Sequence, residues 1–439
     1  MKYLPKMESV ETHQVPKWYE DAKLGIFIHW GLFSVPAFAP PSYELGEISD
    51  DRLWLANNPY AEWYMNSLRL GHGLTYEHHK KTYGVDFPYY RFAELWKAEK
   101  WDPAAWAALF KKAGAQYVIP VTKHHDGFCL WDSAYTDFNS AKQGPARDII
   151  AELSMSLRQE SIRMGLYYSG VLDWRFTRRP ILSGADMEFP ENQTYTYADY
   201  AYNQVMELID LYHPSVLWND IGWPEKGRSD LPTIFAHYYN TVPDGVVNDR
   251  WSGVWHDFTT KEYLFGEKNL QKKWEMTRGI GLSFGYNQIE EEKHLLSSKA
   301  LISLLIDTVA YNGNLLIDIG PKADGTIPGE QETRLLALGN WLETHGEGIY
   351  GTKPWIRQHE KAENGSDIYF TQKDHEIFVF LDNLPQDDSQ ITLAHMGEIR
   401  CIRSLDGENL TFKSKGDTLT ISAHGIKREH PTVGLCLTV

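Results

Sequence analysis

Several residues that could carry acid–base chemistry stand where short apolar segments end. Asp220 follows the apolar run SVLW. Burying a carboxylate at the edge of such a run costs free energy, so the residue is expected either to have a stabilising partner or to serve a function. Trp218 stands beside it, and Arg250 ends the next apolar run, so a guanidinium is available to hold Asp220 ionised. An aromatic and a basic neighbour are typical of a catalytic carboxylate, although an aspartate can also serve as a helix cap or in a structural ion pair.

Three histidines occupy similar positions. His29 ends the first apolar run, and His124 and His125 follow the second. Consecutive residues on a strand point to opposite faces, so this pair does not chelate a metal unless the strand has already ended. The chain has no H-E-x-x-H motif and no paired cysteine spacing, so we predict no metal site and no cofactor. A neutral imidazole offers one donor and one acceptor, which suits the hydroxyl groups of a sugar.

Aromatic residues make up 13% of the chain, and four stand at or near the ends of these runs: Phe27, Trp30, Tyr167 and Trp218. The C–H faces of a pyranose pack on aromatic rings while its hydroxyls seek polar groups. Packing inside the fold is the alternative for any single ring. The glycine-rich segments contain neither G-K-[ST] nor G-x-G-x-x-G, so they do not indicate a nucleotide site.

Short apolar runs that alternate with helical patterns must position these side chains. The runs cover residues 24–30, 115–122, 163–169, 215–220, 245–250, 273–279 and 313–320. The clearest helix spans residues 102–114, with Asp102 as N-cap, Pro103 at its first position and Gly114 beyond its end. Repeated strand–helix units imply a parallel sheet. Together with an eighth strand that is short or irregular, they predict a (β/α)8 TIM-like barrel, with a doubly wound open sheet as the structural alternative.

The pattern changes after Trp355, where helical periodicity gives way to strand-like alternation separated by turn signals such as ENGSD and SLDGEN. We interpret this part as a C-terminal antiparallel β-sandwich. The expected organisation is therefore a catalytic barrel domain over residues 1–346 and a β-sandwich domain over residues 347–439.

Charge and composition limit the partners. The net charge is -16, from 43 Lys+Arg against 59 Asp+Glu, which disfavours nucleic acids and anionic membranes. Three cysteines form no disulfide framework, and the N-terminus has no apolar core of signal-peptide length, so a cytoplasmic location is expected. No apolar stretch approaches the roughly 18 residues of a membrane span. The oligomeric state stays open, a homo-oligomer included.

Six segments, in order, carry a resemblance to a known family. They are DAKLGIFIHWGLFSVPAFAP (21–40), YVIPVTKHHDGFCLWDSAYTDFNS (117–140), GLYYSGVLDW (165–174), VLWNDIGWPEKG (216–227), WEMTRGIGLSFGYN (274–287) and GNLLIDIGPKADGTIP (313–328). They resemble the motifs of the α-L-fucosidases of glycoside hydrolase family 29. The resemblance covers nearly the whole expected barrel, and that family also carries a C-terminal β-sandwich.

The resemblance implies roles for particular residues. Asp220, in LWND, matches the family nucleophile, and Glu262, in FTTKEY, matches the general acid/base of close relatives. Glu267 and Glu275 are the alternatives for the second role. Ten further positions match the sugar pocket, with the two phenylalanines against the C5 methyl of fucose: Phe27, His29, Glu62, Trp63, His124, His125, Tyr167, Trp218, Arg250 and Phe284.

The implied activity is a retaining exo-α-L-fucosidase that acts on aryl or oligosaccharide α-L-fucosides through a covalent intermediate. Retention requires carboxyl groups about 5–5.5 Å apart, whereas inversion requires roughly 6.5–9.5 Å. A linkage-restricted α-1,3/1,4-fucosidase is the nearest alternative. Two other classes stay open, a catalytically inactive fucose-binding barrel and a metal-dependent hydrolase using His29, His124 and His125.

Overall fold

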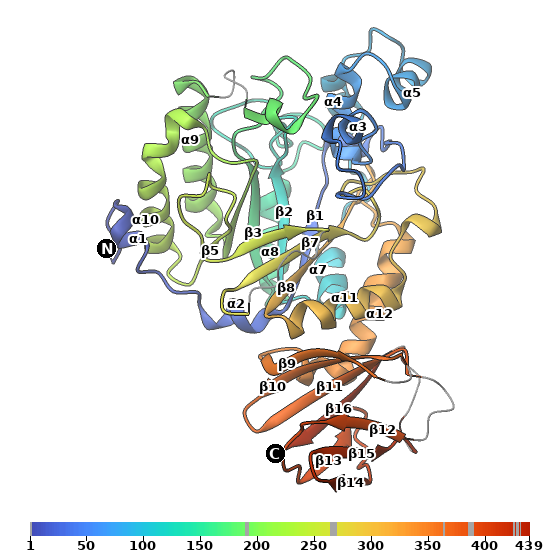
Figure 1. The fold of residues 1–439 in the computed structure, drawn as a ribbon. Coiled ribbons are helices and arrows are strands. Elements are labelled where there is room, and N and C mark those ends of the chain that lie inside the picture. The colour runs from blue at the N-terminus through green and yellow to red at the C-terminus, as the bar shows by residue number, and fades with distance from the viewer. Residues whose placement is uncertain are drawn as a thin grey trace.

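The structure is a computed structural model that describes residues 2–188, 193–263, 270–362, 365–384, 390–424, 426, 430 and 432–439. It contains a parallel eight-stranded sheet wrapped by helices, followed by antiparallel sheets (Figure 1). The strands of the parallel sheet are β1 (Leu24–Ile28), β2 (Tyr117–Lys123), β3 (Arg163–Ser169), β4 (Val216–Asp220), β5 (Val246–Val247), β6 (Thr259–Glu262), β7 (Trp274–Gly279) and β8 (Gly313–Ile319).

The order of the strands is that of a barrel. Hydrogen bonds connect them as β5-β4-β3-β2-β1-β8-β7-β6, so β1 pairs with both β2 and β8 and the sheet curls on itself. A doubly wound sheet would instead reverse its order at a switch point. The prediction of a (β/α)8-type barrel is confirmed, and the open sheet is not adopted.

The strand that the sequence left unplaced is β6. Its four residues, TTKE, are half-buried and lack an apolar period, which explains why pattern alone did not reveal it. It pairs in parallel with β7 over Thr259–Glu262. This short strand carries Glu262 at its end.

Helices cover the outside of the sheet. In the barrel proper they are α7 (Pro103–Lys112), α8 (Ile149–Gln159), α9 (Tyr195–Tyr212), α10 (Leu231–Thr241), α11 (Ser298–Ala310) and α12 (Gly329–His345). The predicted cap of α7 is present, since the Asp102 side chain accepts from Ala104 N and Ala105 N, both at 3.0 Å. Two short helices, α1 (Met7–Val10) and α2 (Lys17–Ala22), precede β1.

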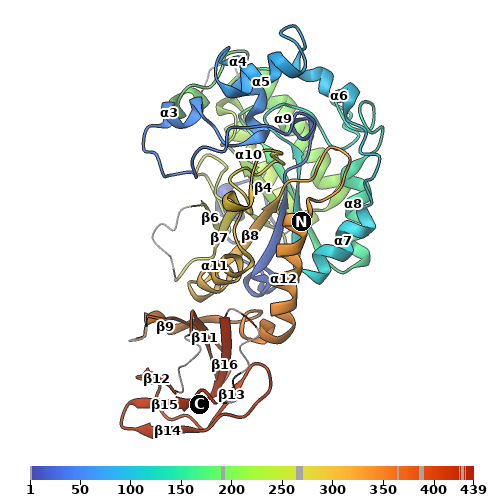
Figure 2. The ribbon, with the colours of Figure 1, turned by 90° about the vertical axis from the view of Figure 1, so that its right-hand side faces the viewer.

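A long insertion follows β1 and contributes to the site. It contains α3 (Asp51–Ala56), η2 (Ala61–Trp63), α4 (Tyr64–Arg69), α5 (Leu74–Thr82) and α6 (Phe92–Leu95). Figures 1 and 2 show α3, α4 and α5 at one end of the barrel, whereas the C-terminal sheets lie beyond the other end. Other short turns of helix are η1 (Leu32–Ser34), η3 (Tyr89–Arg91), η4 (Gly184–Glu188), η6 (Glu225–Asp230), η7 (Glu292–His294) and η8 (Gly346–Gly348).

The C-terminal part is antiparallel, as predicted. One sheet has the order β13-β16-β11-β10-β9 and the other β12-β15-β14. Their bounds are β9 (Lys353–Lys361), β10 (Asp367–Lys373), β11 (Glu376–Asp382), β12 (Gln390–Ala394), β13 (Cys401–Ser404), β14 (Phe412–Lys415), β15 (Thr418–Ser422) and β16 (Thr432–Thr438). Side chains of both sheets, such as Val379 and Ile421, share one buried cluster, so the two sheets form a sandwich.

The interior of the barrel is filled by aromatic and branched side chains, among them Tyr117, Ile119, Tyr167 and Trp218. This layer forms the floor beneath the carboxyl ends of the strands. Within the described residues, no helix combines the length and the apolarity needed to cross a bilayer.

Candidate active site

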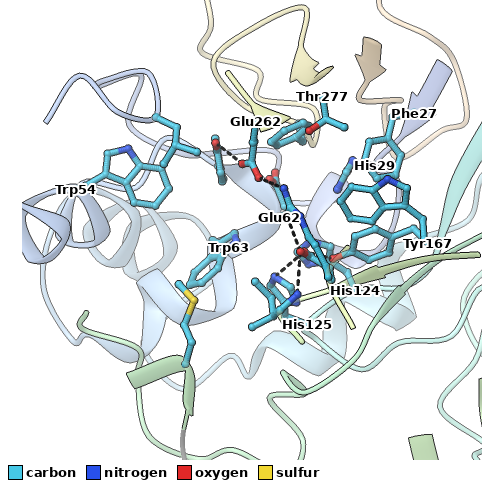
Figure 3. A pocket seen from close by; sticks show the side chains of 18 residues that line it. Phe27, His29, Trp54, Glu62, Trp63, His124, His125, Tyr167, Glu262 and Thr277 are labelled. Atoms are coloured by element: carbon cyan, nitrogen blue, oxygen red, sulfur yellow. Dashed lines mark hydrogen bonds and ion pairs between the residues drawn. The ribbon is translucent and has the colours of Figure 1, made fainter. Parts of the chain in front are cut away.

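A pocket of about 180 Å³ opens at the carboxyl ends of the barrel strands, where the fold class predicts a site (Figure 3). All twelve residues that the sequence proposed for catalysis or substrate binding line it: Phe27, His29, Glu62, Trp63, His124, His125, Tyr167, Trp218, Asp220, Arg250, Glu262 and Phe284. They come from at least six strands or strand ends and from the insertion after β1. The structure thus brings these residues together, while their individual roles stay predictions.

Asp220 is the last residue of β4 and is only 8% exposed. Its Oδ1 accepts from Arg250 Nη1 at 2.7 Å and from Ile221 N at 2.9 Å, and its Oδ2 accepts from Tyr167 OH at 2.8 Å. Burial alone would raise the pKa of Asp220, but the Arg250 charge and these donors outweigh it, so the pKa lies below its ordinary value. The side chain is therefore an ionised carboxylate at neutral pH.

Arg250 connects the two candidate carboxylates. Its Nη1 donates to Asp220, its Nη2 donates to Glu262 Oε2 at 3.0 Å, and its Nε donates to Thr260 Oγ1 at 3.0 Å. The guanidinium also lies over the ring of Trp218, with Cζ 4.8 Å from the centroid. A planar fork held on three sides has little freedom, so it fixes the relative placement of both acids.

Glu262 stands at the end of β6 on the more open side of the pocket. Its Oε1 accepts from Tyr60 OH at 3.0 Å, and Oε2 is held by Arg250. The Glu262 side chain is 20% exposed, against 11% for Asp220. A group that exchanges protons with water needs such access, whereas a nucleophile benefits from its exclusion.

Three neutral imidazoles line the same pocket, and burial lowers the pKa of each well below its ordinary value. The tautomer of His125 follows from its neighbours. Ser169 Oγ donates its hydrogen to Leu172 O, so it accepts from His125 Nδ1 at 2.7 Å. His125 Nε2 is therefore an acceptor, and it lies 3.9 Å from Asp220 Oδ2. His29 is oriented by Asp318 Oδ1, 2.6 Å from its Nδ1.

Glu62, from the insertion after β1, also lines the pocket and is 2% exposed. Its Oε2 accepts from Gly285 N at 2.8 Å. Burial raises the pKa of Glu62 to about 8, against the opposing effect of this hydrogen bond. Figure 3 shows Glu62 and Glu262 directed toward the space that His124 and His125 also face.

The apolar wall consists of ring systems in contact. Phe27 lies 5.1 Å from Trp218 and 6.5 Å from Phe284, measured between ring centroids, and Tyr167 stacks on Trp218 at 5.5 Å. The pocket thus combines these rings with carboxylates and imidazoles, and His29 lies among the rings, 4.7 Å from Phe27 and 4.9 Å from Phe284 between centroids. Such a surface matches a sugar ring with one C–H-rich face and several hydroxyls.

The structure decides two points that the sequence left open. The alternation argument for His124 and His125 held only if the strand continued, and β2 ends at Lys123, so their rings lie 4.0 Å apart in the same pocket, as predicted for both residues. Trp30 does not reach the pocket. It packs edge-on against Trp96 at 4.9 Å, in the layer between sheet and helices.

The alternatives to Glu262 can be placed in part. Glu275 is fully buried and does not line the pocket, since β7 directs it into the barrel interior toward Trp218. Glu267 lies outside the described residues. Of the candidate acids that are described, Glu262 is the one that shares a guanidinium with Asp220.

Six lining residues were not proposed from the sequence: Leu45, Trp54, Tyr60, Met187, Ile221 and Thr277. Four of them lie in the segments after β1 and β3, in loops or helices of at most six residues, such as α3 with Trp54 and η4 with Met187, which are too short to give a clear periodic signal. Thr277 had a detectable signal, because it lies near the end of a predicted strand, two residues beyond Glu275. No set of three His, Cys, Asp or Glu residues in the described ranges is arranged to hold a metal ion.

Known proteins resemble the chain over its whole length. A sequence model of the family described as Alpha-L-fucosidase matches residues 1–347. The alpha-L-fucosidase of Dictyostelium discoideum is 34% identical over 401 residues, which cover 88% of this chain and 82% of that protein.

Two solved structures from Thermotoga maritima share the fold throughout. An alpha-L-fucosynthase in complex with alpha-L-Fuc-(1-2)-beta-L-Fuc-N3 is 52% identical with a TM-score of 0.94, covering 100% of both chains. An alpha-fucosidase in complex with a mechanism based inhibitor is 50% identical with a TM-score of 0.92, also covering 100% of both chains.

Proposed function

The chain belongs to the α-L-fucosidase family of glycoside hydrolases, and from this premise we propose that it removes terminal α-L-fucose with retention of anomeric configuration. The observation that carries the proposal is the fork of Arg250, which binds Asp220 through one nitrogen and Glu262 through another. One guanidinium joining two carboxylates holds them close, as a double displacement requires. The mechanism based inhibitor bound by the Thermotoga maritima relative also supports it.

In the first step, Asp220 attacks the anomeric carbon of fucose. Oδ2 is the freer oxygen, because it accepts one hydrogen bond whereas Oδ1 accepts two. A bond forms between the anomeric carbon and the carboxylate oxygen while the bond to the aglycone oxygen breaks. Glu262 gives its proton to that leaving oxygen. The product of this step is a fucosyl ester of Asp220.

In the second step, Glu262 acts as a base. It takes a proton from a water molecule that attacks the anomeric carbon, and the ester bond to Asp220 breaks. Fucose leaves and both carboxyl groups return to their starting states. The greater exposure of Glu262 fits this exchange with water.

The size of the pocket favours an exo mode of action. Its volume of about 180 Å³ is below the roughly 300–1,000 Å³ of pockets for drug-sized ligands, so it accommodates one sugar ring. In our proposal the neutral imidazoles and Glu62 bind the fucose hydroxyls. Phe27 and Phe284 contact the C5 methyl group.

The stereochemical course is the direct test. Proton NMR of the first minutes of p-nitrophenyl α-L-fucoside hydrolysis should show the α-anomer of fucose as the initial product. Asp220→Gly should reduce kcat by several orders of magnitude while fucose still binds, and external azide should restore turnover with inversion. An initial β-anomer from the unmodified enzyme, or near-normal activity of the variant, would overturn the proposal.

The acid/base assignment has its own test. Glu262→Ala should slow hydrolysis of substrates with poor leaving groups far more than that of aryl fucosides with good ones, because only the former need the proton. Azide should rescue this variant with retention. Glu267→Ala is the matched comparison, and the leaving-group dependence should be absent there.

Linkage preference divides two versions of the activity. We propose the broad version, which cleaves aryl fucosides, over a linkage-restricted α-1,3/1,4-fucosidase. The bound α-(1-2)-linked difucoside of the Thermotoga maritima fucosynthase supports this choice. Comparing kcat/KM for p-nitrophenyl α-L-fucoside and for a Lewis-type trisaccharide decides it, and activity on the trisaccharide alone would contradict us. An inactive fucose-binding barrel would cleave neither.

A further inference from the structure

A buried carboxylate lies directly beneath the pocket and takes no part in the proposed chemistry. Glu275, on β7, is 0% exposed and accepts three hydrogen bonds from side chains of other elements. Its Oε1 accepts from Trp218 Nε1 at 2.9 Å, and its Oε2 accepts from Tyr19 OH at 2.9 Å and from Tyr117 OH at 2.5 Å. Burying a carboxylate is costly even when it is hydrogen-bonded, so an apolar side chain would serve packing better.

The Trp218 indole links this carboxylate to the reactive groups above it. Its N–H points down to Glu275, and its ring supports the Arg250 guanidinium at 4.8 Å and stacks on Tyr167 at 5.5 Å with an interplanar angle of 22°. Arg250 and Tyr167 are in turn the two side-chain donors that hold Asp220. The orientation of one indole therefore affects both oxygens of the nucleophile.

We propose that Glu275 is a positioning residue for fucoside hydrolysis, acting through its hydrogen bond to the Trp218 indole. This bond fixes the ring plane on which the Arg250 fork rests. The fork then holds Asp220 and Glu262 in the relation that the double displacement needs. The inference rests on the proposed roles of those two acids.

The geometry explains why a hydrogen bond is used here rather than packing alone. A tryptophan ring can slide or tilt within an apolar layer, but an N–H with a single acceptor fixes both its tilt and its depth. Trp218 Nε1 has Glu275 as acceptor, and an indole can donate but cannot accept. Displacements of about 1 Å in a catalytic group can cost a hundredfold in rate, so the fixed ring has catalytic value.

Replacing the acceptor tests the proposal. Glu275→Met removes it and should lower kcat by about 5- to 150-fold, the consequence of leaving a buried donor unpaired at the site. KM should change by less than about threefold, because the sugar contacts persist. Glu275→Gln keeps an acceptor of the same shape and should restore kcat to within about threefold of wild type. Burial raises the pKa of Glu275 to about 7, so a neutral side chain here is already close to its natural state.

A double-mutant cycle asks whether the effect passes through the indole. Trp218→Phe keeps an aromatic ring but has no N–H. In that background Glu275→Met should lower kcat by no more than about twofold further, because the bond it breaks is already gone. Multiplicative losses would show that Glu275 acts by another route and would overturn the proposal.

Two controls separate positioning from a general loss of stability. Glu207 on α9 accepts from the Trp131 indole N–H at 2.8 Å, from Ser133 Oγ at 2.9 Å and from Ala134 N at 2.8 Å, away from the pocket. Glu207→Met should lower thermal stability but leave kcat unchanged. Tyr117→Phe removes another donor to the same carboxylate and should keep kcat within about threefold. An equal loss of kcat in either control would refute positioning through Trp218.

The test stays decisive if Glu275→Met does not fold. Trp218→Phe then breaks the same bond from the other end, and the proposal requires a loss of kcat that Tyr117→Phe does not produce. The outcome is also distinct from a failure of the proposed function. An enzyme that retains configuration but shows a multiplicative cycle refutes only the role of Glu275, whereas inversion by wild type refutes the underlying mechanism.

Discussion

Removing the guanidinium of Arg250 should shift the pH dependence of hydrolysis. In Arg250→Met, Asp220 keeps its hydrogen bonds to Ile221 N and Tyr167 OH but loses its partner charge. Burial raises the pKa of this carboxyl and Arg250 opposes burial, so without Arg250 the pKa of Asp220 rises. As the solution is acidified, Asp220, the proposed nucleophile, then loses its ionised form at a higher pH than in wild type.

The size of the effect follows from the burial of the pair. Breaking an ion pair of this kind by removing one partner costs about 3–5 kcal/mol, and the Asp220 and Arg250 side chains are 11% and 23% exposed. At about 1.4 kcal/mol per factor of ten, this corresponds to a loss of about 10² to 4 × 10³ in kcat/KM below the new pKa. The loss should shrink as pH rises, because deprotonation of Asp220 is restored.

The assay is kcat/KM for p-nitrophenyl α-L-fucoside across the pH range in which the enzyme is stable. Arg163→Met is a matched control, since Arg163 also pairs with a carboxylate, Asp244 at 2.8 Å, and lies over a tryptophan, Trp18 at 4.4 Å. That pair is exposed and away from the pocket, so its profile should match wild type. If kcat/KM of Arg250→Met falls at the same acidic pH as kcat/KM of wild type, Arg250 does not keep Asp220 ionised and the electrostatic reasoning is wrong.

Four further outcomes are expected. Tyr60→Phe, which removes the 3.0 Å hydrogen bond to Glu262, should lower kcat by about two- to tenfold in steady-state kinetics, and an unchanged kcat would contradict this. Lys123→Met leaves Asp173 buried without its 3.1 Å partner and should reduce the free energy of unfolding by about 3–5 kcal/mol in denaturant titration; a loss under 1 kcal/mol would mean that water or another group compensates. Asp102→Ala should cost about 1 kcal/mol in the same titration with no effect on kcat, because it removes only the cap of α7. Activity should survive EDTA, and a chelator-sensitive enzyme that zinc restores would favour the metal-dependent alternative.

Much of the candidate site could be predicted because the ends of the strands could be predicted from the sequence. Short apolar runs located β1, β2, β3 and β4, and polar residues directly after them had to meet at one rim of a parallel barrel. Asp220, His29 and Arg250 could be proposed from this logic, and the family resemblance added Glu62 and Glu262. Local sequence suffices here, because the period of a strand and the place where it stops are properties of adjacent residues.

The remaining features depend on contacts between residues far apart in the chain. Tyr60 reaches Glu262 across 202 positions, and neither lies in a segment with a periodic pattern. The downward bond from Trp218 to Glu275 needs the β4 and β7 side chains to meet inside the barrel. His124 and His125 face the same pocket because β2 ends just before them. The end of β2 is in turn set by its pairing with β3.

The amino-acid sequence by itself determined the repeating strand–helix architecture, the family, and the polar residues at the strand ends, because each is encoded in near neighbours. Tertiary structure alone decided that Arg250 spans Asp220 and Glu262 and that Glu275 lies beneath them rather than beside them. The physical reason is that ionisation and orientation in a buried site depend on distances of about 3 Å between distant segments, which only the folded, curled sheet establishes.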